Sequence, residues 1–399
     1  MKWSLCILLF LATTLNYLDR QTLAILAPAI REEFHLDNES LGILFSVFYY
    51  AYTLAQFAIG RVLDRTNLRW AYGFAVLAWS LVAASTSLAV GFASLVAFRL
   101  LLGVAESPNW PAAMRIVAVT LKPHERSLGN GIFTSGTSIG ALIAPAIILG
   151  VSSLFGWRAA FAAVGSTGLI WFAVWVVATR KFECPPAAPS KASADYRAIL
   201  SSPQFWRVLA VSCLINPCLY FNLNWLPTYF SQRFAVTSAK QMTGILTLIY
   251  IGLDLGYLLC GVSALLLVRL GLTVQSARRA AFLLATLLLG LSAMVPLANS
   301  IATASWLLAV VNIGAGMWIC MYLTMAQEVS PGQVSTAAGL LGGSGSLAGA
   351  FAMWGVGWIT KETGGFAVPL TAIALAGLLA AAAGWTVTKP ESPFEKSNP

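Results

Sequence analysis

The sequence predicts an all-α membrane protein with twelve transmembrane helices in two six-helix bundles. The chain of 399 residues is 58% hydrophobic and only 10% charged, whereas soluble domains carry about 25% charged residues. Its apolar residues are gathered in runs of about 20, the length that a helix needs to cross a bilayer. The longest polar stretch, Arg180–Pro203, divides these runs six and six. Such runs do not fit a β-barrel, which needs alternating segments of about 10 residues.

The apolar segments define the expected helices and domains. Their bounds are 4–28, 40–62, 70–90, 93–120, 128–152, 159–179, 205–231, 241–268, 277–298, 302–328, 334–358 and 367–387. The first six form an N-terminal bundle over 1–180 and the last six a C-terminal bundle over 205–399. Residues 181–204 form a linker, because its prolines at Cys184–Lys191 do not continue a helix.

The charge pattern predicts the orientation in the membrane. Basic residues gather in the second loop, the fourth loop, the linker and the eighth loop, whereas the first loop, Glu32–Glu39, is acidic. The positive-inside rule therefore places the linker and both termini in the cytoplasm. The net charge of +9 follows from this topology. It does not indicate nucleic-acid binding, because the basic residues form no continuous stripe. The first segment lacks a small-x-small cleavage site and is expected to stay attached.

A polar cluster, Asn16–Arg20, interrupts the first apolar segment. Charged residues at membrane depth are costly and usually mark a ligand or proton pathway. Adjacent residues on a helix point about 100° apart, so Asp19 and Arg20 face each other poorly. We interpret Asp19 as a titratable group and Arg20 as a fork for a carboxylate. The alternative is an ion pair that only anchors packing.

The fourth segment carries a second charged pair, Arg99 and Glu106. A spacing of seven residues puts both on one helix face, about 10 Å apart along the axis. Burial favours the neutral form of a carboxyl group, so Glu106 is suited to carry a proton. Pro108 and Pro111 follow at once, and interrupted helices often line binding sites. The alternative for Arg99 is a side chain that reaches the membrane surface.

The second segment presents a stripe of Tyr49, Tyr52 and Gln56 at helical spacing. Tyrosine hydroxyls suit a polyhydroxylated ligand, although aromatic packing is an equal alternative for Tyr49. In the seventh segment, Asn222 and Asn224 lie between aromatic residues and indicate a sugar-facing surface or a gate. Asp254 is the only acid deep within the C-terminal half.

The sequence favours a transporter over an enzyme or a receptor. Its histidines, His35 and His124, lie in loops, and the scattered cysteines lack metal-ligand spacing. We therefore assign no catalytic residue, metal or cofactor. A receptor would be expected to carry a further cytoplasmic domain, for which the linker and the tail after Thr388 are too short.

The loop motif Gly60–Arg65 resembles the Gly-x-x-x-Asp-Arg motif of the major facilitator superfamily. With six plus six segments, the resemblance implies the fold of that family and a cytoplasmic gate at Gly60, Asp64 and Arg65. The corresponding region of the C-terminal half, Gly261–Leu266, lacks the Asp-Arg pair.

Within that superfamily the chain is more similar to the anion:cation symporters, in particular the bacterial hexuronate branch. Five stretches carry the likeness: Asn16–Arg20, Arg99–Glu106, Gly131–Gly136, Trp157–Phe161 and Trp225–Tyr229. The resemblance implies that Arg20 grips the substrate carboxylate, with Arg99 as the second basic residue of the site. It also implies that Asp19 and Glu106 take protons.

The same resemblance assigns further substrate contacts. Tyr17 and Tyr52 are expected to bind hydroxyl groups, with Gln56 one turn further along. Trp318 matches a tryptophan of the tenth segment, but the surrounding Gly314–Met321 is nearly apolar here, where hexuronate-type members tend to carry polar side chains.

We therefore expect a symporter that imports an organic anion with protons by alternating access. A hexuronate such as glucuronate or galacturonate is the first candidate, and an aldonate or an aromatic acid the alternative. Sodium stays open as the coupling ion. A proton-driven exporter is a rival, but buried arginines repel cations, and Ala144–Ile148 lacks the antiporter signature Gly-Pro-x-x-Gly-Gly. We expect a functional monomer in the inner membrane, without nucleic acid as a partner.

Overall fold

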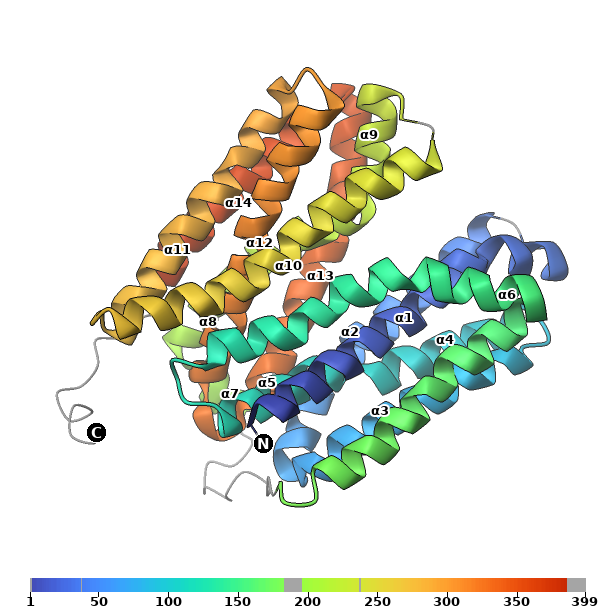
Figure 1. Ribbon diagram of the computed structural model, residues 1–399, viewed down its shortest axis with the longest axis horizontal. Helices are drawn as coiled ribbons and strands as arrows, with labels where there is room; N and C mark the ends of the chain where they lie inside the picture. The colour runs from blue at the N-terminus through green and yellow to red at the C-terminus, as the bar shows by residue number, and fades with distance from the viewer. Residues whose placement is uncertain (1, 37, 183–195, 237, 386–399) are drawn as a thin grey trace. The chain divides into compact units, whose positions relative to one another are not determined.

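A computed structural model describes residues 2–36, 38–182, 196–236 and 238–385, and within these ranges the regular elements are all helices. Each predicted apolar segment coincides with helical structure (Figure 1). The prediction of an all-α fold is therefore confirmed. The proline cluster of the predicted linker lies outside the described residues, so the predicted domain boundaries stay a prediction.

The first half of the chain supplies six long helices. They are α1 (Lys2–Phe34), α2 (Asn38–Arg65), α3 (Leu68–Ser85), α4 (Phe92–Glu106), α5 (Asn109–Thr120) and α6 (Arg126–Ala178). The predicted fourth segment is interrupted between α4 and α5 at Ser107 and Pro108, where proline lacks a backbone N–H. Helix α6 unites two predicted segments, but its backbone leaves helical geometry at Gly156, with φ of 80°.

The second half continues in the same manner. Its helices are α7 (Tyr196–Leu200), α8 (Pro203–Asn224), α9 (Leu226–Phe234), α10 (Ala239–Arg269), α11 (Val274–Gly290), α12 (Ile301–Val329), α13 (Val334–Thr363) and α14 (Ala367–Trp385). The predicted seventh segment is divided into α8 and α9 at Trp225. Short 3-10 turns extend α3 over Thr86–Leu88 and α11 over Leu291–Leu297.

Within the described residues, seven helical stretches are long and apolar enough to cross a membrane by themselves, and α8 with α9 forms an eighth if this bent pair is one span. Helix α1 is not among the seven although it has 33 residues, because its central polar cluster lowers the mean hydropathy. Helix α4 has only 15 residues. Of the two helices that carry the charged pairs, α1 is thus excluded by its hydropathy and α4 by its length.

The chain packs into two compact units that do not follow its order strictly. The first unit comprises Met1–Thr120, Ile132–Tyr196 and Ser330–Gly343, and the second comprises Leu121–Gly131, Arg197–Val329 and Ser344–Pro399. The beginning of α6 therefore packs in the second unit, and the beginning of α13 packs in the first.

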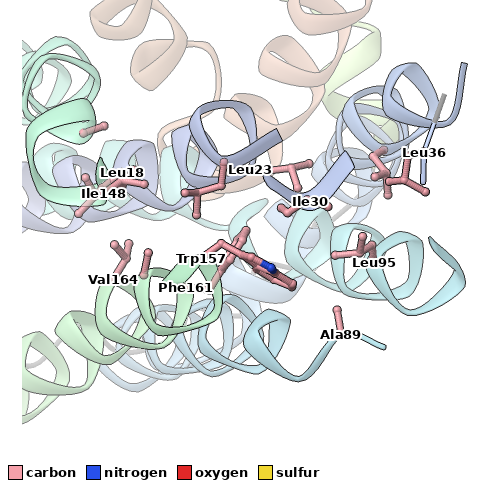
Figure 2. Close-up of a cluster of buried hydrophobic side chains, with 14 residues drawn as sticks. Leu18, Leu23, Ile30, Leu36, Ala89, Leu95, Ile148, Trp157, Phe161 and Val164 are labelled. Atoms are coloured by element: carbon pink, nitrogen blue, oxygen red, sulfur yellow. The ribbon is translucent and has the colours of Figure 1, made fainter. Parts of the chain in front are cut away.

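An apolar core holds α1 in place within the first unit. Leu18, Leu23 and Ile30 of α1 belong to one apolar cluster with Trp157 and Phe161 from the part of α6 beyond Gly156 (Figure 2). Burial of each such side chain is worth about 1.5–3 kcal/mol in soluble proteins, whereas in lipid the same contacts contribute mainly by close packing. Because Leu18 faces this core, the adjoining polar residues of α1 are directed elsewhere.

Two glycines bring the site helices into backbone contact. A Cβ atom on Gly103 of α4 would lie 2.5 Å from the carbonyl oxygen of Phe48 on α2. A Cβ atom on Gly140 of α6 would lie 2.6 Å from the carbonyl oxygen of Thr14 on α1. Small residues at such crossings permit close helix packing in membranes. They set the distance between α2 and α4 and between α1 and α6.

An ionic clamp joins three segments at one end of the first unit. The Glu33 carboxylate at the end of α1 accepts hydrogen bonds from Trp157 Nε1 at 2.6 Å and Arg158 Nη1 at 2.8 Å. Arg158 also donates to the carbonyl oxygen of Ala89 at 3.0 Å. The hydrogen bonds from Trp157 and Arg158 lower the pKa of Glu33 from its ordinary value. The side chains of Glu33 and Arg158 are partly exposed, so solvent screens the clamp and its contribution to the free energy of unfolding is small.

This clamp predicts a specific loss of stability in acid. Because the folded-state pKa of Glu33 is depressed, its contribution is present above the unfolded pKa of about 4.3 and is lost as the pH falls through the lowered value. Glu33→Gln should therefore lower the melting temperature near pH 7 and show a weaker fall than the parent protein below about pH 4.3. The measurement is thermal unfolding in detergent from pH 7 to pH 3. Glu32→Gln changes the exposed neighbouring residue and should keep the pH profile of the parent protein. A parent-like pH profile for Glu33→Gln would refute the clamp.

Candidate functional site

The polar cluster of α1 is buried inside the first unit. Asn16 is 0% exposed and Asp19 is 4% exposed. A buried carboxyl and a buried amide cost free energy unless they are paired. The cluster is therefore the first place to look for a binding site.

Arg20 pairs with Glu106 of α4 rather than with its neighbour Asp19. The distance between Arg20 Nε and Glu106 Oε2 is 2.7 Å, and Glu106 is fully buried. Arg20 is 14% exposed at its side chain. The expectation that Asp19 and Arg20 face each other poorly agrees with this pairing. A buried ion pair is weak evidence for stability, because removing two charges from water offsets much of their attraction.

Three aromatic rings surround the Arg20 guanidinium. Its Cζ lies 4.6 Å from the ring centre of Tyr52, 5.0 Å from Phe48 and 5.1 Å from Tyr17. The Phe48 ring is also 5.3 Å from the Cζ of Arg99. Cation–π contacts of this kind favour the charged guanidinium in a site that holds little water. Phe48 thus bridges the two arginines.

Sequence reasoning missed Phe48. It lies one helical turn before Tyr52 on the same face of α2, and the two rings stack with centres 5.8 Å apart. An extension of the Tyr52–Gln56 stripe by four residues would have found it. Two members of the predicted stripe are neighbours, since Gln56 Nε2 donates to the Tyr52 hydroxyl at 3.0 Å. The third, Tyr49, is 46% exposed, whereas Tyr52 and Gln56 are buried.

Arg99 and Glu106 lie on the same helix but form no ion pair among the described residues; Arg99 contacts Phe48 instead. The two side chains therefore do not meet part way along the helix. Arg99 is 6% exposed, so it does not reach the surface as the alternative required.

Several buried polar atoms of this cluster have no hydrogen-bond partner. They are both side-chain amide atoms of Asn16, Asp19 Oδ1, Arg20 Nη2, Gln56 Oε1, Arg99 Nε and Glu106 Oε1. Each such atom costs about 1–3 kcal/mol when buried. Their concentration between α1, α2 and α4 indicates a site built for polar ligand atoms and for changes of pairing, not for packing alone.

The residues predicted for the second half lie in the second unit and are packed differently. Asn222 is 3% exposed, and its Nδ2 donates to Asn312 Oδ1 at 2.7 Å. Asn224 is exposed, and its Nδ2 donates to the backbone oxygen of Tyr220 at 2.7 Å. The two amides therefore do not form one surface. Asn312 was missed, because nothing in the sequence relates α12 to α8.

The apolar tenth segment is the central helix of the second unit. Helix α12 packs against α10 and α11, and Trp318 is 0% exposed with its ring 4.8 Å from Phe282. This central position explains why the neighbours of Trp318 are apolar. Asp254 lies on α10 and is partly buried.

Within the first unit, the predicted gate motif holds the beginning of α13. Asp64 accepts hydrogen bonds from the backbone N–H groups of Ser335 at 3.1 Å and Thr336 at 2.7 Å, and from the Thr336 hydroxyl at 2.7 Å. A carboxylate at a helix N-terminus is favoured by the unpaired N–H groups and the helix dipole. The absence of a side chain on Gly60 lets the backbone of Ser335 approach.

The arginine beside Asp64 is Arg115 of α5 and not Arg65 of the motif. Arg115 Nε lies 3.6 Å from Asp64 Oδ1, and Arg115 also donates to the backbone oxygen of Leu63. Arg65 is exposed and forms no ion pair with Asp64 among the described residues. Sequence reasoning missed Arg115, which lies in α5 after the proline interruption.

The fold and the buried charges define a membrane transporter, and comparisons with known proteins agree. Residues 9–353 match the model of the Major Facilitator Superfamily, so the chain belongs to that family. The D-galactonate transporter of Escherichia coli O6:H1 is 27% identical over 94% of this chain and 93% of its own length. The hexuronate transporter of Escherichia coli (strain K12) is 26% identical over 99% of this chain and 96% of its own.

A solved structure supports the fold. The fucose:proton symporter FucP of E. coli superposes with a TM-score of 0.72 and 16% identity, over 97% of this chain and 98% of that chain. The predicted major facilitator fold and the predicted class, a transporter and not an enzyme, are therefore both confirmed.

The Asp64 contacts predict unequal effects of two neighbouring substitutions. Asp64→Ala leaves two backbone N–H groups and a hydroxyl without their acceptor, and hydrogen bonds to a charged group are worth about 1.5–3 kcal/mol. We expect a melting temperature at least about 3 °C lower in detergent, since 1 kcal/mol moves a domain of this size by about 2–4 °C. Arg65→Ala is the matched control and should move it by less than about 1 °C. An equal or larger loss for Arg65→Ala would refute this assignment.

Proposed function

We propose that this chain imports a sugar acid together with protons by alternating access. The observation that carries the proposal is the buried Arg20–Glu106 pair, in which Arg20 Nη2 and Glu106 Oε1 have no hydrogen-bond partner. A guanidinium forms its strongest contact as a fork around a single carboxylate. A substrate carboxylate and Glu106 therefore compete for the same group.

Competition for Arg20 couples the anion to a proton. When Glu106 binds a proton from the outside solution, it releases Arg20, which then binds the incoming carboxylate. Asp19 of α1 lies near Glu106 of α4 and takes a second proton. The loaded carrier holds less uncompensated charge and rocks closed around the site. On the inside, loss of the protons restores the Arg20–Glu106 pair and expels the substrate.

The surrounding side chains support a polyhydroxylated substrate. Tyr17, Tyr52 and Gln56 offer hydroxyl and amide groups next to Arg20, with Arg99 on the far side of Phe48. Two basic residues favour an anion over a hydrophobic cation. The names of the similar transporters support a hexuronate, such as glucuronate or galacturonate, and equally an aldonate. In the second unit, Asn222, Asn224 and Trp318 stay predicted contacts.

The remaining assignments complete the proposal. The protein functions as a monomer in the bacterial inner membrane, with both termini on the cytoplasmic side as the positive-inside rule requires. Protons are the coupling ion, and sodium is the alternative that the transport assay separates. No cofactor takes part.

Transport by purified protein in liposomes tests the proposal. With an alkaline interior and no sodium, labelled D-glucuronate or D-galactonate should accumulate about tenfold per pH unit and coupled proton, since one unit is worth 1.4 kcal/mol. A protonophore should abolish the accumulation. If uptake does not respond to the pH gradient but follows a sodium gradient, sodium and not the proton is the coupling ion. If neither acid is taken up, the proposed substrate class is refuted.

Glu106→Gln separates coupling from binding in the same assay. This variant should lose accumulation driven by the pH gradient but retain exchange of labelled for unlabelled substrate. Glu362→Gln is the matched control, because Glu362 lies exposed near the end of α13, and it should accumulate substrate as the parent does. Persistent accumulation by Glu106→Gln would show that another group carries the coupled proton.

A further inference from the structure

Asn16 is the buried polar residue that the proposed cycle leaves without a role. It lies on α1 one helical turn before Arg20, so both side chains lie on the same face. Its side chain is 0% exposed, and neither Nδ2 nor Oδ1 has a hydrogen-bond partner. Two unpaired polar atoms cost about 1–3 kcal/mol each. A leucine of similar size would avoid that cost, so packing alone does not account for an asparagine.

The neighbour of Asn16 is the carboxyl group of Glu106. The Asn16 amide lies within reach of this carboxyl group without a hydrogen bond of good geometry to it. Glu106 Oε2 is occupied by Arg20 Nε at 2.7 Å, whereas Oε1 has no partner. Asn16 and Arg20 thus flank the same carboxyl from successive turns of α1.

The two guanidinium groups near this carboxyl cannot serve it in both protonation states. Arg20 and Arg99 interact with it as cations that only donate hydrogen bonds. Asp19 carries a proton itself in the proposed cycle, so its ability to donate changes with its own protonation state. The Tyr52 hydroxyl interacts with both Arg20 and Glu106 but already accepts a hydrogen bond from Gln56. A side-chain amide differs, because it donates through Nδ2 to a carboxylate and accepts through Oδ1 from a protonated carboxyl.

We propose that Asn16 is the exchange partner of Glu106: when Arg20 turns to a substrate carboxylate, the Asn16 amide takes up the released carboxyl group. Asn16 is then a positioning residue, which acts on substrate through Glu106 and Arg20. While Arg20 and Glu106 are paired, Nδ2 and Oδ1 of Asn16 are unpaired and cost free energy. In return, Glu106 has a partner in place when Arg20 leaves it. The step at Arg20 rests on the proposed function, whereas the Asn16–Glu106 contact can be tested without substrate.

A thermal stability cycle without substrate tests the exchange. In the parent protein, Asn16→Leu should leave the melting temperature unchanged or raise it, because it removes two unpaired atoms. In an Arg20→Met background, where Glu106 has lost its first partner, the same substitution should lower it by about 2–4 °C. Thr13→Val is the matched control, since Thr13 Oγ1 is also buried and unpaired on α1, and its effect should be the same in both backgrounds. Destabilisation by Asn16→Leu of equal size in both backgrounds would overturn the proposal.

A binding cycle tests the same exchange if the Arg20→Met protein does not fold. We expect Asn16→Leu to weaken the Kd of D-glucuronate or D-galactonate about tenfold, or 1.4 kcal/mol. In the Glu106→Gln variant, which has no ion pair to break, the loss should be less than about twofold. Asn16→Ser, which keeps one group that donates and accepts, should recover part of the affinity. Equal losses in both backgrounds would overturn the proposal, whereas binding of neither acid by the parent protein would refute the proposed function and leave the stability cycle to decide on Asn16.

Discussion

The structure of the first unit depends on one constraint: a guanidinium and a carboxyl group, Arg20 and Glu106, are held 2.7 Å apart away from water. Two helices supply them, so α1 and α4 both carry charge, and neither is among the helices long and apolar enough to cross a membrane by themselves. Aromatic rings of α2 lie against the guanidinium, and backbone contact at Gly103 brings α2 to α4. The pair is a poor source of stability. In the proposed cycle its value is that a third group, a proton or a carboxylate, separates the pair.

The helices could be predicted because their signal is local. Apolar runs of about 20 residues report the membrane directly, and every predicted run coincides with helical structure. Local chemistry also explains the interruptions, at Pro108 between α4 and α5 and at Gly156 within α6. The division into two units could not be predicted in the same way. The beginnings of α6 and α13 each pack with helices of the other half of the chain, and no hydropathy pattern records such an exchange.

The site was predictable where its residues share one helix. Spacing alone placed Gln56 beside Tyr52, and adjacency alone indicated that Asp19 and Arg20 face each other poorly. The sequence could not predict which side chains pair between helices, because such pairing depends on helix rotation and crossing distance. Glu106 therefore pairs with Arg20, while Arg99 contacts Phe48. Asn222 pairs with Asn312 and Asp64 with the N-terminus of α13 for the same reason.

The proton balance of substrate binding tests the central claim most directly. If anion and proton are linked through Arg20, the linkage is reciprocal, and binding of the anion must raise proton occupancy. Addition of pH-matched D-glucuronate or D-galactonate to the purified protein in weak buffer near pH 7 should therefore draw protons from solution, and Glu106→Gln should reduce that uptake. Saturating binding of the anion with no proton uptake by the parent protein would contradict the account.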